Sequence, residues 1–212
     1  MKKLDEGNMK SIFLTTSNLL AYPTQLLKSR VSLFEELMAQ TSLTTSQLMK
    51  PFSKWFLHQD LIELQKHYVE VFDQKRSSCL YLTFFLNGDT RQRGMALWRF
   101  AQKYKEFGFE LDNGELPDFL PAVLEFAATI EFEAGLNLLQ SHHRALLVLA
   151  TSLEKQESPY AILLKILIDN LPPLSEKELK AAEALINAGP PTEMVGLEGY
   201  RGPVPISIGV RP

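Results

Sequence analysis

Apolar positions recur every three or four residues along most of this chain, with polar positions between them. That period is typical of amphipathic helices packed around a core. Proline, glycine and capping residues divide the pattern into segments, because proline is tolerated at a helix start but disrupts a helix interior. We therefore predict an all-α protein with helices over residues 11–20, 23–38, 46–58, 60–72, 90–107, 116–132, 142–155, 158–167 and 175–188.

The segment from Cys79 to Leu86 is apolar at every position except Thr83. Its composition fits a short buried strand or a buried helix, and the lack of a partner strand elsewhere favours the helix. Cys79 is then a buried, unreactive thiol. As the single cysteine it cannot form an internal disulfide, which suits a reducing compartment. The side chains expected in the core are Leu64, Tyr68, Leu82, Phe85, Leu97, Phe100, Ala101, Tyr104, Leu124 and Leu146.

A change in composition near residue 188 divides the chain into two parts. Residues 1–188 carry the helical pattern and are long enough for one domain with a full core. Residues 189–212 hold five of the eleven glycines and five of the twelve prolines and show no helical period. We predict a single helical domain over 1–188, followed by an irregular tail over 189–212.

Bulk charge and hydrophobicity exclude several classes of protein. The formal net charge is -3, which disfavours a nucleic-acid-binding protein. The start of the chain lacks the apolar stretch and cleavage site of a signal peptide. The longest apolar runs, such as Ala145 to Ala150, are much shorter than a membrane span. We expect a cytoplasmic protein without stable membrane insertion.

Negative charge is concentrated in one stretch, from Glu110 to Glu133. It contains seven acids and no Lys or Arg: Glu110, Asp112, Glu115, Asp118, Glu125, Glu131 and Glu133. One interpretation is an acidic rim beside apolar helices, which would bind a basic, apolar peptide. The other is that Asp118 caps a helix while the remaining acids face water, and the pattern alone favours this second interpretation. The spacing places Asp118 and Glu125 on one helix face.

No catalytic or metal site is recognisable in the sequence. The four histidines lack the spacings of di-iron bundles and zincins, and we predict that Glu63 and His67 form a surface pair. There is no nucleophile elbow and no glycine-rich phosphate loop. Arg91 and Arg93 stand in the first turn of a predicted helix, where cations oppose the helix dipole. We expect them to meet an acid, such as Asp73 or Asp89, or a partner.

Three segments in this order resemble a known family. They are His67-Tyr68-Val69-Glu70-Val71-Phe72-Asp73, Gly88-Asp89-Thr90-Arg91-Gln92-Arg93-Gly94, and Glu115 to Pro121 with Leu124-Glu125-Phe126. Together they are similar to NarJ-type nitrate reductase assembly chaperones, within the TorD/DmsD/NarJ group of molybdoenzyme maturation factors. The resemblance covers roughly Leu14 to Leu167.

The resemblance implies a non-enzymatic, TorD-like helical domain that works in the cytoplasm, as a monomer or small homo-oligomer. It would bind the apo catalytic (alpha) subunit of a molybdenum-dependent nitrate reductase, partly through that subunit's N-terminal segment. It would support molybdenum cofactor insertion before membrane attachment, and would itself hold no cofactor stably. Other interpretations left open are maturation of another molybdoenzyme, a helical subunit of a permanent complex, and an enzyme on a helical bundle.

The family also implies a peptide-binding groove. The residues expected to bind the client peptide are Tyr68, Phe72, Asp73, Arg91, Arg93, Glu115, Asp118, Phe119, Pro121 and Glu125. Tyr68, Phe72 and Asp73 would form one wall, and Asp118 and Glu125 would lie on or near another. Many family members have His where this chain has Phe119. The Phe removes a titratable group and favours apolar contact with a client helix.

Overall fold

The computed structural model describes residues 5–111 and 114–188, and within these ranges the predicted all-α fold is confirmed. Extended backbone pairs there at a single antiparallel bridge, between Tyr81 and Phe119. The predicted tail, 189–212, lies outside the described residues. The α-helices are α1 Glu6–Leu19, α2 Gln25–Thr41, α3 Leu43–His58, α4 Leu61–Tyr68, α5 Leu82–Asn87, α6 Arg91–Glu106, α7 Leu120–Thr129, α8 Phe132–Ser141, α9 His143–Lys155, α10 Ala161–Asn170 and α11 Glu176–Ala188. A π-helical turn, Val69–Asp73, and a 3₁₀ turn, Arg76–Ser78, follow α4.

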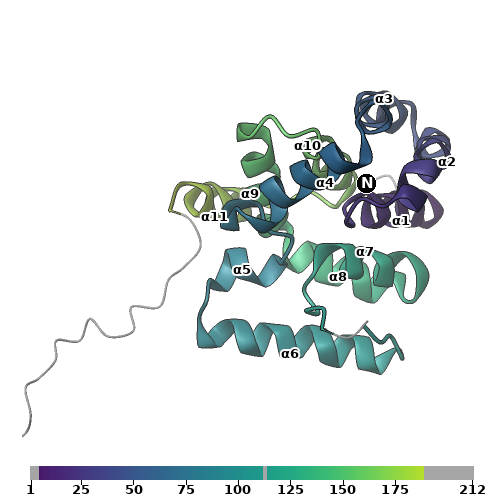
Figure 1. The fold of residues 1–212 in the computed structure, drawn as a ribbon. Coiled ribbons are helices and arrows are strands. Elements are labelled where there is room, and N and C mark those ends of the chain that lie inside the picture. Colours follow the sequence, from purple (N-terminus) through teal and green to yellow (C-terminus); the bar gives the residue numbers. More distant parts are fainter. Residues whose placement is uncertain (1–4, 112–113, 189–212) are drawn as a thin grey trace, which may run out of the picture.

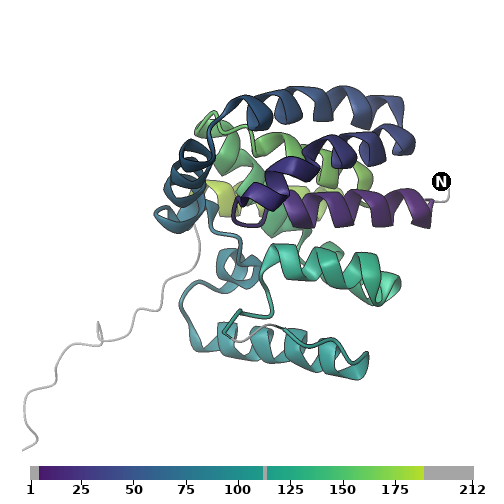
Figure 2. The same cartoon turned by 45° about the vertical axis from the view of Figure 1, so that its right-hand side comes forward.

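The helices form three tiers, as Figures 1 and 2 show. One large tier contains α1 to α4 with α9 to α11, and α7 and α8 form the next tier. The helix α7 packs against both α1 and α8, so it joins the first tier to the second. The helix α6 is the outermost element on that side in both views. None of the described helices is both long and apolar enough to cross a bilayer.

Local chemistry explains where several helices begin. The side chains of Asp5, Thr24 and Ser42 accept hydrogen bonds from backbone N–H groups in the first turns of α1, α2 and α3. Ser175 and Glu178 form the predicted capping box of α11, because the Ser175 N–H and hydroxyl both donate to the Glu178 carboxylate. Helices α1 and α3 start earlier than predicted, since caps at Asp5 and Ser42 add a turn to each.

An aromatic cluster joins α3, α4 and the start of α10. The Tyr160 ring lies 4.9 Å from Phe72 and 5.6 Å from Trp55. His67 stacks on Tyr160, and its Nε2 lies 3.0 Å from the Ser158 hydroxyl. The predicted surface pair of Glu63 with His67 is therefore wrong, because Glu63 pairs with Lys66 instead.

The prediction of one helix over 116–132 is wrong in two respects. The residues before Leu120 are not helical, and the helix ends at Thr129. A separate helix, α8, begins at Phe132 and was missed, because it has no side-chain N-cap hydrogen bond and no proline at its start. Similarly, α5 begins only at Leu82, because Tyr81 takes part in the bridge with Phe119.

Most of the predicted core is buried, with two exceptions on α6. Leu97 is only half-buried and Ala101 is exposed, whereas Phe100 and Tyr104 are buried as predicted. The cause is the peripheral position of α6, whose closest helix partner is the short α5. Only one narrow stripe of α6 therefore reaches the core.

Gly135 allows α7 and α8 to pack closely. A Cβ atom at this position would overlap the Ala127 side chain and backbone. Gly94, in contrast, lies in α6 with open space around the position of a Cβ. The two glycines therefore differ in what a methyl group would do to the packing.

We predict that Gly135→Ala lowers the free energy of unfolding by about 1–3 kcal/mol, because α7 and α8 must move apart. Gly94→Ala is the matched control and should raise stability by about 0.5–1 kcal/mol, since alanine loses less entropy in a helix. Urea unfolding of both variants measures the difference. Equal effects of the two substitutions would contradict the close α7–α8 packing.

Burial lowers the pKa of His67, His142 and His143 below the ordinary value of 6.5. The unfolded chain therefore binds protons more readily, so stability present above the unfolded pKa is lost as pH falls below it. We expect the melting temperature to drop between about pH 7.5 and about pH 5.5. His67→Gln, whose amide can still meet Ser158, should make this drop smaller; an unchanged drop would show that His67 does not contribute.

Candidate functional site

A groove with acidic sides lies between α1 and α7, beside the segment that leads from α6 to α7. It has a volume of about 410 Å³ and contains three carboxylates but no Lys or Arg. We call it the acidic groove. Its lining residues are Leu14, Ser17, Asn18, Ala21, Phe109, Glu110, Leu111, Glu115, Phe119, Pro121, Ala122 and Glu125.

A buried hydrogen bond ties the two helical walls of the groove together. The Ser17 hydroxyl on α1 donates to the Pro121 carbonyl at 2.8 Å. These helices also pack extensively against each other. A buried bond of this kind satisfies both groups and fixes their separation. The two helical walls are thus fixed relative to each other, and the segment before α7 completes the lining with Phe109, Glu110, Leu111, Glu115 and Phe119.

The third family segment is held at the base of the groove by what we call the clamp. The clamp is the backbone pairing of residues 80–82 with residues 118–120, together with the bonds between Asp118 and Thr83. The Leu120 N–H donates to the Leu80 carbonyl at 2.8 Å, and the Leu82 N–H donates to the Asp118 carbonyl at 3.1 Å. From α6, the Tyr104 hydroxyl donates to the Pro117 carbonyl at 2.8 Å.

Asp118 is the centre of the clamp and is 0% exposed. One of its carboxylate oxygens accepts hydrogen bonds from the Thr83 N–H at 2.9 Å and the Thr83 hydroxyl at 2.6 Å. Thr83 lies in the first turn of α5, so Asp118 caps that helix. The interpretation that Asp118 caps a helix is confirmed, although the capped helix is α5 rather than the helix that follows Asp118. An exposed position of Asp118 on an acidic rim is wrong.

Asp118 and Glu125 do not share a helix face, contrary to the prediction. Asp118 precedes α7, which begins at Leu120, and its carboxylate is directed to α5. Glu125 is exposed in the middle of α7 and lines the groove. The two acids therefore have different surroundings: one is internal and structural, the other accessible.

Glu115, which lines the groove, also accepts a hydrogen bond from outside it. The Tyr81 hydroxyl donates to the Glu115 carboxylate at 3.3 Å, and burial, with Glu115 beside it, raises the pKa of Tyr81 to about 12. Burial also raises the pKa of Tyr68, with Asp73 and Glu115 among the nearby charges that add to the effect. Both phenols stay neutral. Asp73 and Glu115, which are far apart in the sequence, both lie close enough to Tyr68 and Tyr81 to raise the pKa of these phenols.

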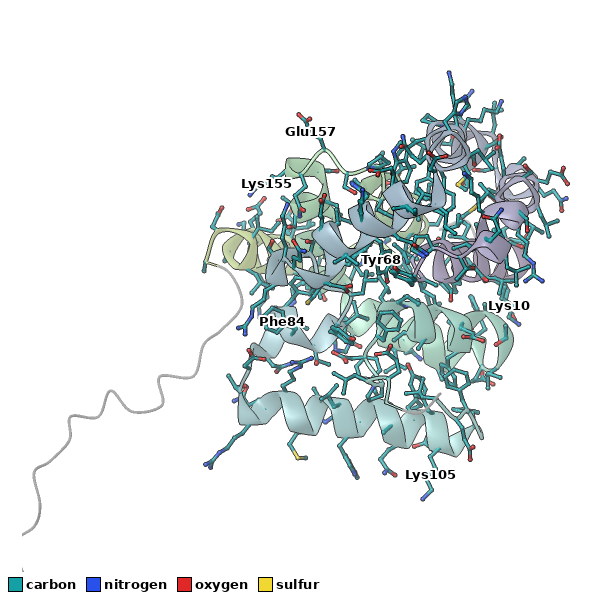
Figure 3. The ribbon with its side chains drawn as sticks, in the orientation of Figure 1. Lys10, Tyr68, Phe84, Lys105, Lys155 and Glu157 are labelled. Atoms are coloured by element: carbon teal, nitrogen blue, oxygen red, sulfur yellow. The ribbon has the colours of Figure 1, made fainter. Side chains whose placement is uncertain are left out.

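The predicted binding residues fall into three groups. Glu115, Phe119, Pro121 and Glu125 line the groove together. Tyr68 and Phe72 do not form a wall: they are 5% and 4% exposed and pack on each other and on Tyr160. Figure 3 shows Tyr68 inside the body of the domain. Asp73 is exposed at the end of the π-helical turn.

Arg91 and Arg93 lie on α6 and do not line the groove. The Arg93 guanidinium pairs with Asp89 at 3.3 Å, which confirms one of its two expected internal acids. The same side chain lies over the Phe84 ring, and its Nε is 3.4 Å from the Thr83 hydroxyl. Arg93, a residue of the second family segment, therefore connects that segment to the clamp through Thr83.

One side of the groove was not predicted from the sequence. Leu14, Ser17 and Asn18 come from α1 and Ala21 from the turn after it, about a hundred residues before the acidic stretch. The only local signal was the polar run Thr15 to Asn18, which follows the apolar Ile12 to Leu14. Glu110 belongs to the predicted acidic stretch and does line the groove, whereas Asp112 lies outside the described residues.

The described residues contain no group of three or more His, Cys, Asp or Glu placed to hold a metal ion. Cys79 is half-buried, and burial raises the pKa of its thiol, which makes it a poor nucleophile. The acidic groove, with three carboxylates beside apolar side chains, is suited to binding an apolar, positively charged ligand.

The fold has a counterpart among solved structures. A crystal structure from Archaeoglobus fulgidus, described as a candidate redox enzyme maturation protein, superposes with a TM-score of 0.56 at 22% identity. The match covers 76% of this chain and 92% of that one. The class defined by the fold is thus an all-α domain of the kind found in that protein.

Sequence comparison places the chain more closely. Residues 35–163 match the nitrate reductase delta subunit family, and this chain belongs to that family. The nitrate reductase molybdenum cofactor assembly chaperone NarJ of Escherichia coli K12 is 30% identical over 155 residues, 72% of this chain and 66% of that protein. The nitrate reductase-like protein NarX of Mycobacterium tuberculosis H37Rv is 37% identical over 145 residues, 68% of this chain.

The coverage of these relatives is partial. The chain spans just under two thirds of the length of the Escherichia coli protein and 22% of the mycobacterial one. The matched regions contain all or most of the three segments on which the resemblance rested, and the NarJ-type assignment is confirmed.

We predict that Asp118→Ala lowers the free energy of unfolding by about 1–3 kcal/mol, because the buried Thr83 N–H and hydroxyl lose their acceptor. Glu125→Ala, an exposed acid only seven residues away, should change stability by no more than about 0.5 kcal/mol. Chemical denaturation with circular dichroism compares the two. A harmless Asp118→Ala would show that the clamp does not stabilise the domain.

Proposed function

We propose that this protein is a non-catalytic, client-specific chaperone for a molybdenum-dependent nitrate reductase. It binds the apo catalytic subunit in the cytoplasm, partly through that subunit's N-terminal segment. It supports insertion of the molybdenum cofactor into the client before membrane attachment, and holds no cofactor stably itself. Membership of the nitrate reductase delta subunit family and the name of the Escherichia coli relative support this role.

The observation that carries the proposal is the composition of the acidic groove. Glu110, Glu115 and Glu125 surround apolar side chains from Leu14, Leu111 and Phe119. Apolar surface binds the apolar side of a peptide, while the acids select cationic flanks over anionic ones. A basic, amphipathic client segment fits both requirements.

The dimensions of the groove indicate how such a segment would sit. At about 410 Å³ the groove takes a few side chains rather than the full cross-section of a helix. The client segment therefore binds as a short helix that inserts the anchors of one face. Phe119, which stands where many family members have His, supplies apolar area there without a titratable group.

We predict a saturable 1:1 heat signal when the N-terminal peptide of the nitrate reductase catalytic subunit is titrated into the protein. The heat-capacity change should be negative, because apolar surface is buried. Affinity should fall as salt rises, since exposed charge pairs are screened over about 10 Å at 0.1 M ionic strength. No binding at micromolar peptide would remove the peptide-recognition role.

The double variant Glu115→Gln/Glu125→Gln should weaken this binding about five- to ten-fold, which corresponds to about 1–1.4 kcal/mol. Its salt dependence should shrink as well. The matched control is Glu154→Gln on α9, which removes one exposed acid away from the groove. An equal loss in the control would mean that only the overall charge matters. A strain that lacks the protein, and any related chaperone, should lose nitrate reductase activity.

A further inference from the structure

The outward side of α6 combines large apolar side chains with positive charge. Met95 is 57% and Trp98 56% exposed. Positions 91, 95, 98 and 105 follow one face, opposite the buried Phe100 and Tyr104. The side of α6 that faces away from the core is therefore not a solvated polar surface.

The charge of α6 is predominantly positive. Five basic residues and a single acid, Glu106, lie within Arg91–Glu106. Glu106 pairs with Lys103, and Arg93 pairs with Asp89, whereas the side chains of Arg99 and Lys105 are exposed. Exposed leucines on α2, such as Leu33, share their helix with Glu35 and Glu36, whereas α6 combines the exposed Met95 and Trp98 with five basic residues.

The position of α6 suits a flat partner. It is the outermost element on its side of the molecule in both views, and the labelled Lys105 points away from the body in Figure 3. Its 16 residues span about 24 Å along the helix axis. A peripheral helix with exposed Trp98 and Met95 can lie along a planar surface.

We propose that the outward face of α6 binds the surface of an anionic phospholipid bilayer. Met95 and Trp98 enter the headgroup region, where the amphipathic indole is favoured, while Arg99 and Lys105 meet lipid phosphates. The contact is peripheral and reversible. It leaves the acidic groove free, because no residue of α6 lines that groove.

The test is co-sedimentation of the full-length protein with vesicles of phosphatidylcholine, alone or mixed with phosphatidylglycerol. We expect sedimentation only with the mixed vesicles, and less of it at high salt. In a Trp55→Phe background Trp98 is the sole tryptophan, so its emission should shift to the blue on binding. Equal binding to both vesicle types, or to neither, would overturn the proposal.

Matched variants locate the contact. Arg99→Glu/Lys105→Glu should weaken binding more than ten-fold, since each surface cation contributes about five-fold. Trp98→Ala should weaken it too. The controls, Arg30→Glu/Lys50→Glu and Leu33→Ala, make the same kinds of change at exposed sites of α2 and α3. An equal loss of vesicle binding in the control variants would overturn the proposal. So would a result in which the unmodified protein does not bind vesicles but the α6 variants bind the client peptide more weakly. Peptide titration of the same variants shows separately whether the groove still works.

Discussion

The site depends on one buried carboxylate. Asp118 reaches from the segment before α7 to the first turn of α5, and the paired backbone on either side excludes water from the contact. A buried acid without its hydrogen-bond donors would be strongly unfavourable, so the two segments can fold stably only in contact. That contact places Glu115 and Phe119 on one side of the groove. The hydrogen bond from Ser17 to the Pro121 carbonyl fixes α1 against α7 on the other side. The acid most conspicuous in the sequence therefore organises the groove without lining it.

The distribution of charge gives the molecule two unlike surfaces. The acidic groove has three carboxylates over apolar side chains, and the outward face of α6 has cations around Met95 and Trp98. Only a few residues separate the end of α6 from Phe109 in the groove. Because each surface selects ligands of opposite sign, a basic peptide and an anionic surface need not compete. The net charge of -3 hides this separation.

Burial also changes what the first family segment contributes. Tyr68 and Phe72 pack on Tyr160, and the Tyr68 hydroxyl donates to the Leu20 carbonyl at 3.0 Å. They fix the end of α1, from which Leu14 and Ser17 reach the groove. A substitution at Tyr68 acts on the groove through this packing rather than by removing a contact with the ligand. Whether Asp73 meets the client stays a prediction.

The sequence by itself determined the helical class, most of the core, the capping box at Ser175 and the acidic stretch, because periodicity and caps depend on neighbours a few residues apart. The three segments also identified the family. Only the tertiary structure decided which acids line the groove and that α1 supplies a wall. It also decided that Asp118 caps α5 and that a separate α8 packs on Gly135. These features join residues far apart, 104 positions for Ser17 with Pro121 and 35 for Thr83 with Asp118, and a local pattern carries no record of such pairings.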